Sequence, residues 1–355
     1  MLSPTIGTFV RSVAAVAVAT NLLQPAAAKA PLNDAAYSII HRWTLTGAGG
    51  WDYLTLDPAR HRLFIARDTR VEVVATDTGA VVGRILNTDG VHGVALASDL
   101  KRGFTSNGRA NSVTEFDYET LAPLRTVPVS GSNPDAILYD GEHGHLFTFN
   151  GRSKDVTVLD ATSLKVVATI GMPDKPEFAV QDGHGHIFVN IESDAGQMVV
   201  IDAGKLAVAS TWALPGCASP SGLALDAVHH RLFSVCDGNV MAVTDSVSGK
   251  PVARVRIGDG PDAAGYWPAR GLVFSSNGEG SLTIVQGAGD VYSVLSTLAT
   301  QRGARTMAVD SQTGLVYLAT SSYGPAPAAT PEHPHPRPVP LPDTFTVLVA
   351  APALR

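Results

Sequence analysis

Seven residues that could contact a ligand recur along this sequence at spacings of about 40 to 45 residues. Six of the seven are ionisable, although only 16% of the chain is charged. The set consists of Asp52, His92, Asp135, Glu177, Ser221, Asp262 and Arg305. If a fold gathers them around one axis, four carboxylates and an imidazole would suit a hard or borderline divalent cation, or a cationic or hydroxylated ligand. We therefore take these residues as the candidate ligand-binding site.

Two kinds of chemistry are open to this set. In the first, the side chains bind a small molecule or a partner protein and no bond is broken. In the second, a divalent metal ion promotes hydrolysis of a lactone or ester, with His92 as general base. The metal ligands would then be Asp52, Asp135, Glu177 and Asp262. A solvated channel lining would also account for a polar ring, and an ion pair from Arg305 to Asp52 or Asp262 would argue against a metal.

The elements that must position these residues repeat with the same period. Each unit has a short apolar strand, a turn with Asp or Gly, a basic or histidine residue, and an aromatic that opens a second strand. The aromatics are Phe64, Phe104, Phe147, Phe188, Phe233, Phe274 and Tyr317. A period in this range is typical of an array built from one supersecondary unit. The content of Gly (34) and Pro (23) agrees with many short strands joined by tight turns.

Each unit is predicted to hold four antiparallel strands, which in the first unit cover residues 53–56, 63–66, 71–74 and 80–85. Radially arranged units of this kind form a β-propeller. The last unit ends after a strand at 345–349, and a spare strand at Ser38–Leu45 precedes the first unit. Pairing of these two strands would complete the last blade and remove an exposed sheet edge. The prediction is an all-β, seven-bladed propeller of four-stranded antiparallel blades, closed by its N-terminal strand.

In such a ring the first strand of each blade is innermost, so the residues that open these strands lie at one mouth of the central channel. The seven candidate residues occupy this position. We call this end of the channel the funnel face.

The end of the second strand carries an aromatic-x-x-Asn pattern in several units. It occurs as Phe104-Thr105-Ser106-Asn107, Phe147-Thr148-Phe149-Asn150 and Phe274-Ser275-Ser276-Asn277. With the strands and turns that follow, this pattern resembles the YVTN-type β-propeller repeat of secreted YncE-like proteins, over essentially all of the mature chain. The resemblance implies a propeller that serves as a binding protein, a surface protein, or a subunit of an enzyme that carries a cofactor or partner. The chain departs from the pattern at Arg67, Cys236 and Thr320, where Asn is expected.

The N-terminal segment is predicted to be a signal peptide. An apolar stretch at residues 12–20 follows Arg11, and Pro25 with three alanines completes a cleavage pattern. We expect cleavage after Ala28, which leaves residues 29–355 as one propeller domain in the periplasm or outside the cell. An anchored or disordered N-terminus is the alternative. No later segment is apolar enough to cross a membrane.

Cys217 and Cys236 are the only cysteines. Both are predicted at the funnel face, so that an oxidising compartment permits a disulfide, with two buried thiols as the alternative. Neither forms the motif of covalent haem attachment or of thioredoxin-like chemistry. A proline-rich insertion at residues 323–343 interrupts the last blade and would be a lid over the funnel, a docking arm for a partner, or a disordered loop.

Two histidine pairs have metal-like spacing: His143 with His145, and His184 with His186. They fall in the turn between the first two strands, on the face opposite the funnel, where a structural role is expected. The net charge of −6 without a basic cluster argues against a nucleic-acid partner. The function that we expect is a monomeric, non-catalytic scaffold that binds a small molecule or protein at the funnel face. The alternatives are the metal-dependent, lactonase-like hydrolase and a subunit of a redox complex without a cofactor of its own; a divalent metal ion is the only cofactor considered.

Overall fold

The computed structural model describes residues 1–2, 37–328, 330 and 338–353. The predicted signal peptide therefore lies almost wholly outside the described residues, as does the middle of the proline-rich insertion. Residues 35–355 form one compact unit. Its described part holds seven four-stranded sheets and a single 3-10 turn at Pro58–Arg60. The described residues contain no helix of the length and apolarity that a membrane crossing requires.

The strands follow one another as sequential antiparallel sheets, which we number as blades. Blade one consists of β2 (Leu54–Asp57), β3 (Arg62–Arg67), β4 (Arg70–Ala75) and β5 (Val81–Leu86). Blade two consists of β6 (Val91–Ala97), β7 (Arg102–Asn107), β8 (Ser112–Asp117) and β9 (Pro123–Pro128). Blade three consists of β10 (Pro134–Asp140), β11 (His145–Asn150), β12 (Asp155–Asp160) and β13 (Val166–Gly171).

The remaining blades have the same layout. Blade four consists of β14 (Lys175–Gln181), β15 (His186–Glu192), β16 (Gln197–Asp202) and β17 (Ala207–Ala213). Blade five consists of β18 (Leu223–Asp226), β19 (Arg231–Cys236), β20 (Val240–Asp245) and β21 (Pro251–Arg256). Blade six consists of β22 (Pro261–Trp267), β23 (Leu272–Asn277), β24 (Ser281–Ala288) and β25 (Val291–Ala299). Blade seven consists of β26 (Thr306–Val309), β27 (Val316–Thr320), β28 (Phe345–Pro352) and the N-terminal β1 (Tyr37–Leu45).

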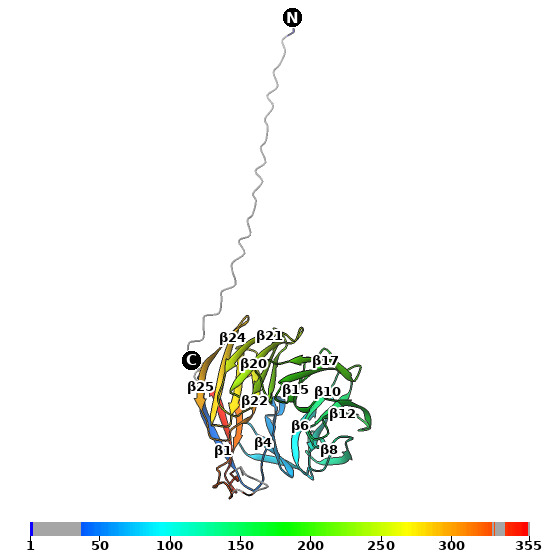
Figure 1. The fold of residues 1–355 in the computed structure, drawn as a ribbon, viewed down its shortest axis with the longest axis vertical. Coiled ribbons are helices and arrows are strands. Elements are labelled where there is room, and N and C mark those ends of the chain that lie inside the picture. Colours follow the sequence, from blue (N-terminus) through cyan, green and yellow to red (C-terminus); the bar gives the residue numbers. More distant parts are fainter. Residues whose placement is uncertain (3–36, 329, 331–337, 354–355) are drawn as a thin grey trace. The chain divides into compact units, whose positions relative to one another are not determined.

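The first strands of the blades form a closed inner ring. Each contacts the first strand of the next blade, in the order β2, β6, β10, β14, β18, β22, β26 and back to β2. The colours in Figure 1 accordingly pass around the ring from blue through green to red. This arrangement confirms the predicted seven-bladed β-propeller.

The ring is closed by β1, as the sequence predicts. β1 pairs with β28 along its whole length, from Tyr37 opposite Pro352 to Leu45 opposite Phe345. In Figure 1 the blue N-terminal strand lies beside the red C-terminal one. The Tyr37 hydroxyl also donates to the Gly314 carbonyl (2.9 Å), so this strand is tied to the blade by a side chain as well. Without β1, the outer edge of β28 would present unpaired backbone groups.

The core lies between neighbouring sheets. The aromatics that open the second strands are at most 2% exposed in all seven blades, and each packs among apolar residues of two adjacent sheets. The strands β3, β7, β11 and their equivalents are buried on both faces, whereas outer strands such as β9 are largely exposed. Exposed side chains, which alternate with more buried ones where a strand has one solvated face, are therefore found mainly in the fourth strand of each blade.

Three of the turn histidines contact the aspartate of their own turn. His143 lies 2.7 Å from Asp140, His186 lies 2.9 Å from Asp182, and His229 bonds to the aspartate of its own turn in the same way (2.7 Å). Each pair joins the imidazole Nδ1 to a carboxylate that also accepts backbone N–H bonds in that turn. Among the described residues, none of these histidines belongs to a group with metal-ligand geometry.

Candidate functional site

The seven candidate residues stand at equivalent places in the ring. His92, Asp135, Glu177 and Asp262 lie near the start of their inner strands, and the other three lie just before theirs. All inner strands run in the same sense, since each blade repeats the same antiparallel order. The fold therefore brings the seven backbone positions to one end of the channel. Their side chains, however, have different partners. Three of them form a cluster, three take part in ion pairs, and Ser221 bonds to the backbone.

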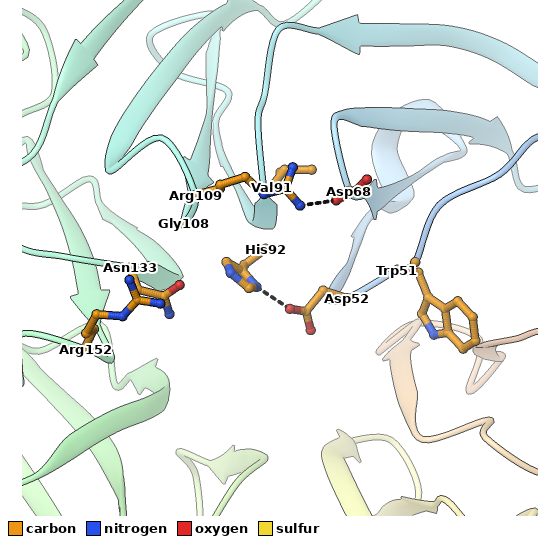
Figure 2. Close-up of a pocket in the computed structure, with 11 residues that line it drawn as sticks. Trp51, Asp52, Asp68, Val91, His92, Gly108, Arg109, Asn133 and Arg152 are labelled. Carbon is orange, nitrogen blue, oxygen red and sulfur yellow. Dashed lines mark hydrogen bonds and ion pairs between the residues drawn. The ribbon is translucent and has the colours of Figure 1, made fainter. Parts of the chain in front are cut away.

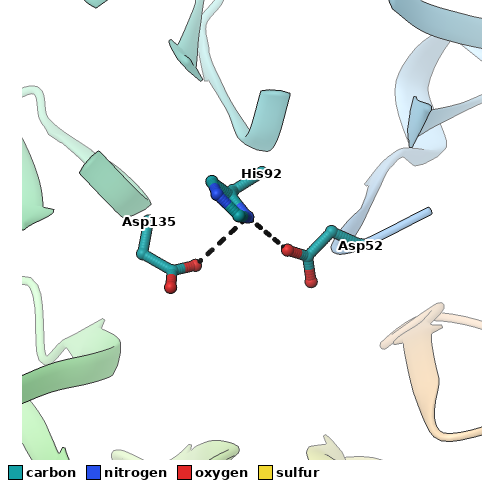
Figure 3. A group of neighbouring side chains, drawn as sticks. All are labelled: Asp52, His92 and Asp135. Carbon is teal, nitrogen blue, oxygen red and sulfur yellow. Dashed lines mark hydrogen bonds and ion pairs between the residues drawn. The ribbon is translucent and has the colours of Figure 1, made fainter. Parts of the chain in front are cut away.

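Asp52, His92 and Asp135 form a compact cluster. His92 Nδ1 is 2.5 Å from Asp52 Oδ2 and 3.7 Å from Asp135 Oδ1. Figure 3 shows the imidazole between the two carboxyl groups. One ligand-capable atom from each residue lies within 4.8 Å of the others. The three side chains come from blades one, two and three, so only closure of adjacent inner strands places them together. We call this group the acidic cluster.

The acidic cluster attracts positive charge. Burial opposes the charge of the His92 imidazolium, but the hydrogen bond to Asp52 and the charges of the carboxylates outweigh it and raise the His92 pKa to about 9. Burial also raises the pKa of Asp135 to about 6, although the imidazolium acts against this shift. At neutral pH the His92 imidazole therefore carries a proton beside Asp52 and Asp135. A cation of another kind would compete with that proton for the same position.

Glu177 does not join the acidic cluster. Its carboxylate lies 2.7 Å from Lys175 Nζ, and the same ammonium also pairs with Glu192. Burial and the nearby charge of Asp135 raise the Glu177 pKa to about 8, against the pull of Lys175. Glu177 therefore keeps its proton at neutral pH. Lys175 and Glu192 were not among the sequence candidates.

Asp262 and Arg305 form a loose pair, with 3.5 Å between Arg305 Nε and Asp262 Oδ2. Burial raises the Asp262 pKa to about 6, opposed by the charge of Arg305. Ser221 is bonded to the backbone, and its hydroxyl donates to the Pro261 carbonyl (3.3 Å). Of the four proposed metal ligands, the structure thus brings together only Asp52 and Asp135, and it adds His92 to them.

An aromatic pair crosses the channel next to these charges. The Tyr53 hydroxyl of blade one donates to the Glu177 carbonyl of blade four (3.3 Å), and the ring lies 5.2 Å from that of Phe178. Burial and the surrounding carboxylates raise the Tyr53 pKa well above its ordinary value, so this hydroxyl stays protonated. The two rings narrow the channel beside the carboxylates.

A pocket of about 370 Å³ opens beside the acidic cluster. Asp52 and His92 line it on the side of the acidic cluster, and Figure 2 shows both side chains at the opening. The rest of the charged lining is mixed and consists of Asp68, Arg109 and Arg152. This volume is within the range that small-molecule sites occupy. We call it the acidic pocket.

Arg67 holds the loop that carries Trp51 and Asp52. Its fully buried guanidinium donates to the carbonyl oxygens of Gly47, Gly49 and Gly50 at 3.2 to 3.4 Å and pairs with Glu72 (3.4 Å). Burial lowers the Arg67 pKa to about 10, against the attraction of Glu72. Gly49 has a φ of 112°, which an L side chain rarely adopts, so the loop depends on glycine there.

The repeat explains why blade one needs an arginine. In blades two, three and six the asparagine at this position donates to a Ser or Thr hydroxyl of the next strand, as Asn150 does to Thr157 (2.9 Å). In blade one the place of that threonine is taken by Glu72, which lies opposite Ile65 in the same register. The neutral Asn–Thr pair is thus replaced by the ion pair Arg67–Glu72.

Blades five and seven replace the asparagine in other ways. Cys236 forms a disulfide with Cys217, with 5.1 Å between their Cα atoms. Thr320 donates to the Arg302 carbonyl (2.7 Å). Blade four also departs from the repeat, with Ile191 at this position. At Arg67, Cys236 and Thr320, the end of the second strand is fastened to the loop that leads into an inner strand. The disulfide resolves the alternative that the sequence leaves open.

Among the residues that surround the candidate site, sequence reasoning missed Trp51, Tyr53 and Lys175. Two of them adjoin the candidate Asp52, and the third stands two positions before Glu177. Adjacency to the ring positions in the sequence could therefore have identified these residues. The sequence does not reveal which cation each carboxylate pairs with.

Comparison with known proteins places the fold. No protein-family model matches the chain, and no curated protein sequence matches it significantly. Among solved structures, Kuenenia stuttgartiensis hydrazine synthase is similar with a TM-score of 0.68 and 15% identity, over 77% of this chain and 94% of that one. The structure of U3-55K has a TM-score of 0.70 and 13% identity, over 88% and 98%.

A chain of the mitotic checkpoint complex gives a TM-score of 0.69 and 15% identity, over 86% of this chain and 95% of that one. At such low identities these similarities concern the fold alone. They agree with the seven-bladed β-propeller fold.

Proposed function

We propose that this protein is an exported, monomeric, non-catalytic binding propeller of the YVTN type, which takes a ligand at its funnel face. In this proposal, Asp52, His92 and Asp135 recognise a cationic group, either a divalent metal ion or an organic ammonium. The observation that carries it is the convergence of these three side chains from three blades beside the acidic pocket. Elsewhere on the rim, Lys175 contacts both Glu177 and Glu192, and Arg305 lies 3.5 Å from Asp262.

Export is supported by the N-terminal sequence pattern and by the disulfide. Cys217 and Cys236 are both about 1% exposed or less and bonded to each other. Disulfides of this kind persist in oxidising compartments such as the periplasm. Detection of the mature N-terminus after Ala28 in a periplasmic fraction tests this part of the proposal.

The binding proposal predicts how affinity changes with pH. Because His92 has a pKa of about 9, a metal ion that binds its nitrogen must displace a proton at neutral pH. Affinity for Zn²⁺ should therefore rise by about tenfold per pH unit until the imidazole is neutral near pH 9. An alkylammonium probe, which contacts the carboxylates without displacing that proton, should show a much flatter profile.

Isothermal titration with Zn²⁺ and, separately, with ethylammonium tests the proposal on the mature protein. Asp135→Asn should weaken the probe that binds by at least about tenfold, since it removes one of two carboxylates. Asp290→Asn is the matched control, because this exposed aspartate pairs with Arg231 (2.6 Å) and lines neither this pocket nor the acidic cluster. Equal affinity in both variants, or no binding of either probe, would contradict the proposal.

A metal-dependent hydrolase is the second candidate, because the acidic cluster contains two carboxylates and an imidazole. The geometry changes the roles expected from the sequence: His92 lies between the carboxylates as a third ligand, and Glu177 is engaged by Lys175. A proton-bearing His92 is a poor general base below pH 9. Zn²⁺-dependent turnover of a lactone that is lost in Asp135→Asn would favour this candidate. The similarity to hydrazine synthase concerns the fold and supports no redox role.

A further inference from the structure

A second pocket of about 370 Å³ adjoins the acidic pocket at Trp51 and has a different lining. It shares Gly50 and Trp51 with the acidic pocket. Its other lining residues are Gly278, Arg302, Gly303, Arg305, Tyr323, Pro338 and Pro340. No carboxylate is among them. We call it the arginine pocket.

Two guanidinium groups supply the charge of this pocket. Arg302 is exposed, and within the described part of the chain its guanidinium has no ion pair. Arg305 is 48% exposed and reaches Asp262 only at 3.5 Å, a loose contact that leaves most of its donors available. The guanidinium fork matches the two oxygens of a carboxylate, and it binds them more strongly where apolar walls exclude water.

Two aromatic rings supply flat apolar walls. The Trp51 ring lies 6.4 Å from that of Tyr323 and 5.3 Å from that of Phe345. Arg67 stacks on the other side of this group, with its guanidinium carbon 3.8 Å from the Phe345 ring centre. Tyr323 rests on Gly303, where a Cβ atom would come within van der Waals overlap of the phenol and where φ is +82°. Contacts with Phe345 and Gly303 thus fix the positions of the Trp51 and Tyr323 rings.

The described ends of the proline-rich insertion complete the wall. Tyr323 forms an isolated bridge with Pro340, the Gly324 amide donates to the Val339 carbonyl (3.0 Å), and the Leu341 amide donates to Ser322 (2.8 Å). These backbone bonds fix Pro338 and Pro340 beside the rings. The insertion is therefore built into the funnel face at this point.

We propose that the arginine pocket is a binding subsite for an aromatic carboxylate. The ring of the ligand would lie against Trp51 and Tyr323, and its carboxylate would be held by Arg302 and Arg305. This inference does not depend on the cation proposal, since it uses a different pocket and the opposite charge. A single-ring acid is of a size that the volume accommodates.

The test is a titration of the mature protein with benzoate, benzamide, acetate and inorganic phosphate, followed by calorimetry and Trp fluorescence. Saturable binding of benzoate, with at least about tenfold weaker binding of benzamide and acetate, is the expected result, because both the charge and the ring contribute. Absence of benzoate binding overturns the inference. Equal binding of phosphate overturns it as well, since the site would then recognise charge alone.

Variants separate this pocket from the rest of the face. Arg302→Gln and Trp51→Leu should each weaken benzoate binding by about tenfold. Arg256→Gln is the control, because this arginine is exposed at the end of β21 and lines neither pocket. Thermal unfolding shows that each variant folds, and Zn²⁺ titration of Arg302→Gln should match the parent protein. Loss of benzoate binding in Arg256→Gln would also contradict the inference.

Discussion

The two arcs of the funnel rim treat their carboxylates differently. In the arc of blades one to three, Asp52 and Asp135 share one imidazole. In the arc of blades four to seven, Lys175 lies between Glu177 and Glu192, and Arg305 forms a loose pair with Asp262. In the first arc the imidazole of His92 carries the proton at neutral pH, whereas in the second arc Glu177 carries one. A recurring residue position is thus not a recurring function; the local counter-ion decides which carboxylates remain open to a ligand.

The arcs also differ in how their loops are anchored. The loop before Asp52 is held by the non-covalent contacts of Arg67, and the loop before Ser221 is held by the disulfide of Cys217. A buried ion pair responds strongly to the loss of one partner, while a disulfide acts mainly by restricting the unfolded chain. Loss of the Arg67 contacts should therefore disturb the folded first arc, and ligand binding there, more than loss of the disulfide disturbs the folded second arc.

The largest effect is expected from Arg67→Met. This change leaves three loop carbonyls without their donor and removes one cation from buried Glu72. The free energy of unfolding should fall by roughly 3 to 5 kcal/mol, and Zn²⁺ affinity should fall with it because Asp52 loses its position. Urea denaturation and calorimetry measure the two quantities.

Arg84→Met is the matched control for Arg67→Met. Arg84 also pairs with Glu72 (3.3 Å), but its side chain is 49% exposed. Its loss should cost no more than about 1 kcal/mol and leave Zn²⁺ affinity unchanged. Similar losses in both variants would show that charge on Glu72, rather than the loop contacts of Arg67, sets the difference between the arcs.

The next largest effect is expected from removal of the disulfide. The double variant Cys217→Ala and Cys236→Ala opens a covalent loop whose ends are 19 residues apart. Unfolding free energy should fall by about 3 kcal/mol, because the unfolded chain regains the entropy of that loop. Zn²⁺ affinity should be preserved. An equal loss of affinity in this variant and in Arg67→Met would mean that the arcs are not independent.

The sequence predicted the fold because the determinants of the fold are local and repeated. The aromatic of each second strand, the alternation of the strands and the spare strand near Trp43 can all be read without knowing any long-range contact. The seven rim positions follow from the same period. Which of them meet does not follow, because it depends on the direction of each side chain around the ring.

Particular residues illustrate that limit. Tyr53 reaches a carbonyl 124 residues away, and Lys175 turns toward Glu177 and Glu192 across its own blade. Arg67 stood out in the sequence as a departure from the repeat. Its role required the further observation that Glu72 replaces the threonine found in other blades, and an alignment of the third strands would have supplied it.

The smallest effect is expected from the pH dependence of the second arc. The folded protein raises the Glu177 pKa from 4.5 to about 8, so between these values it holds a proton that the unfolded chain has released. Stability must then fall as pH rises through this window, because deprotonation favours the unfolded state. Asp135 and Asp262 act in the same direction with their pKa values raised to about 6.

Glu177→Gln removes the contribution of that one group while it keeps the shape of the side chain. Urea denaturation between about pH 5 and pH 8 should show a decline in unfolding free energy that is smaller than in the parent protein by roughly 2 kcal/mol. Glu192→Gln is the control, since the pKa of Glu192 is lowered by its bond to Lys175, with burial acting against this shift. A group with a lowered pKa gives stability that is lost on acidification, so this variant should not flatten the decline above pH 5. If the two variants give the same profile, Lys175 does not distinguish its two carboxylates, and the rim of the second arc is one shared charge network rather than a set of separate pairs.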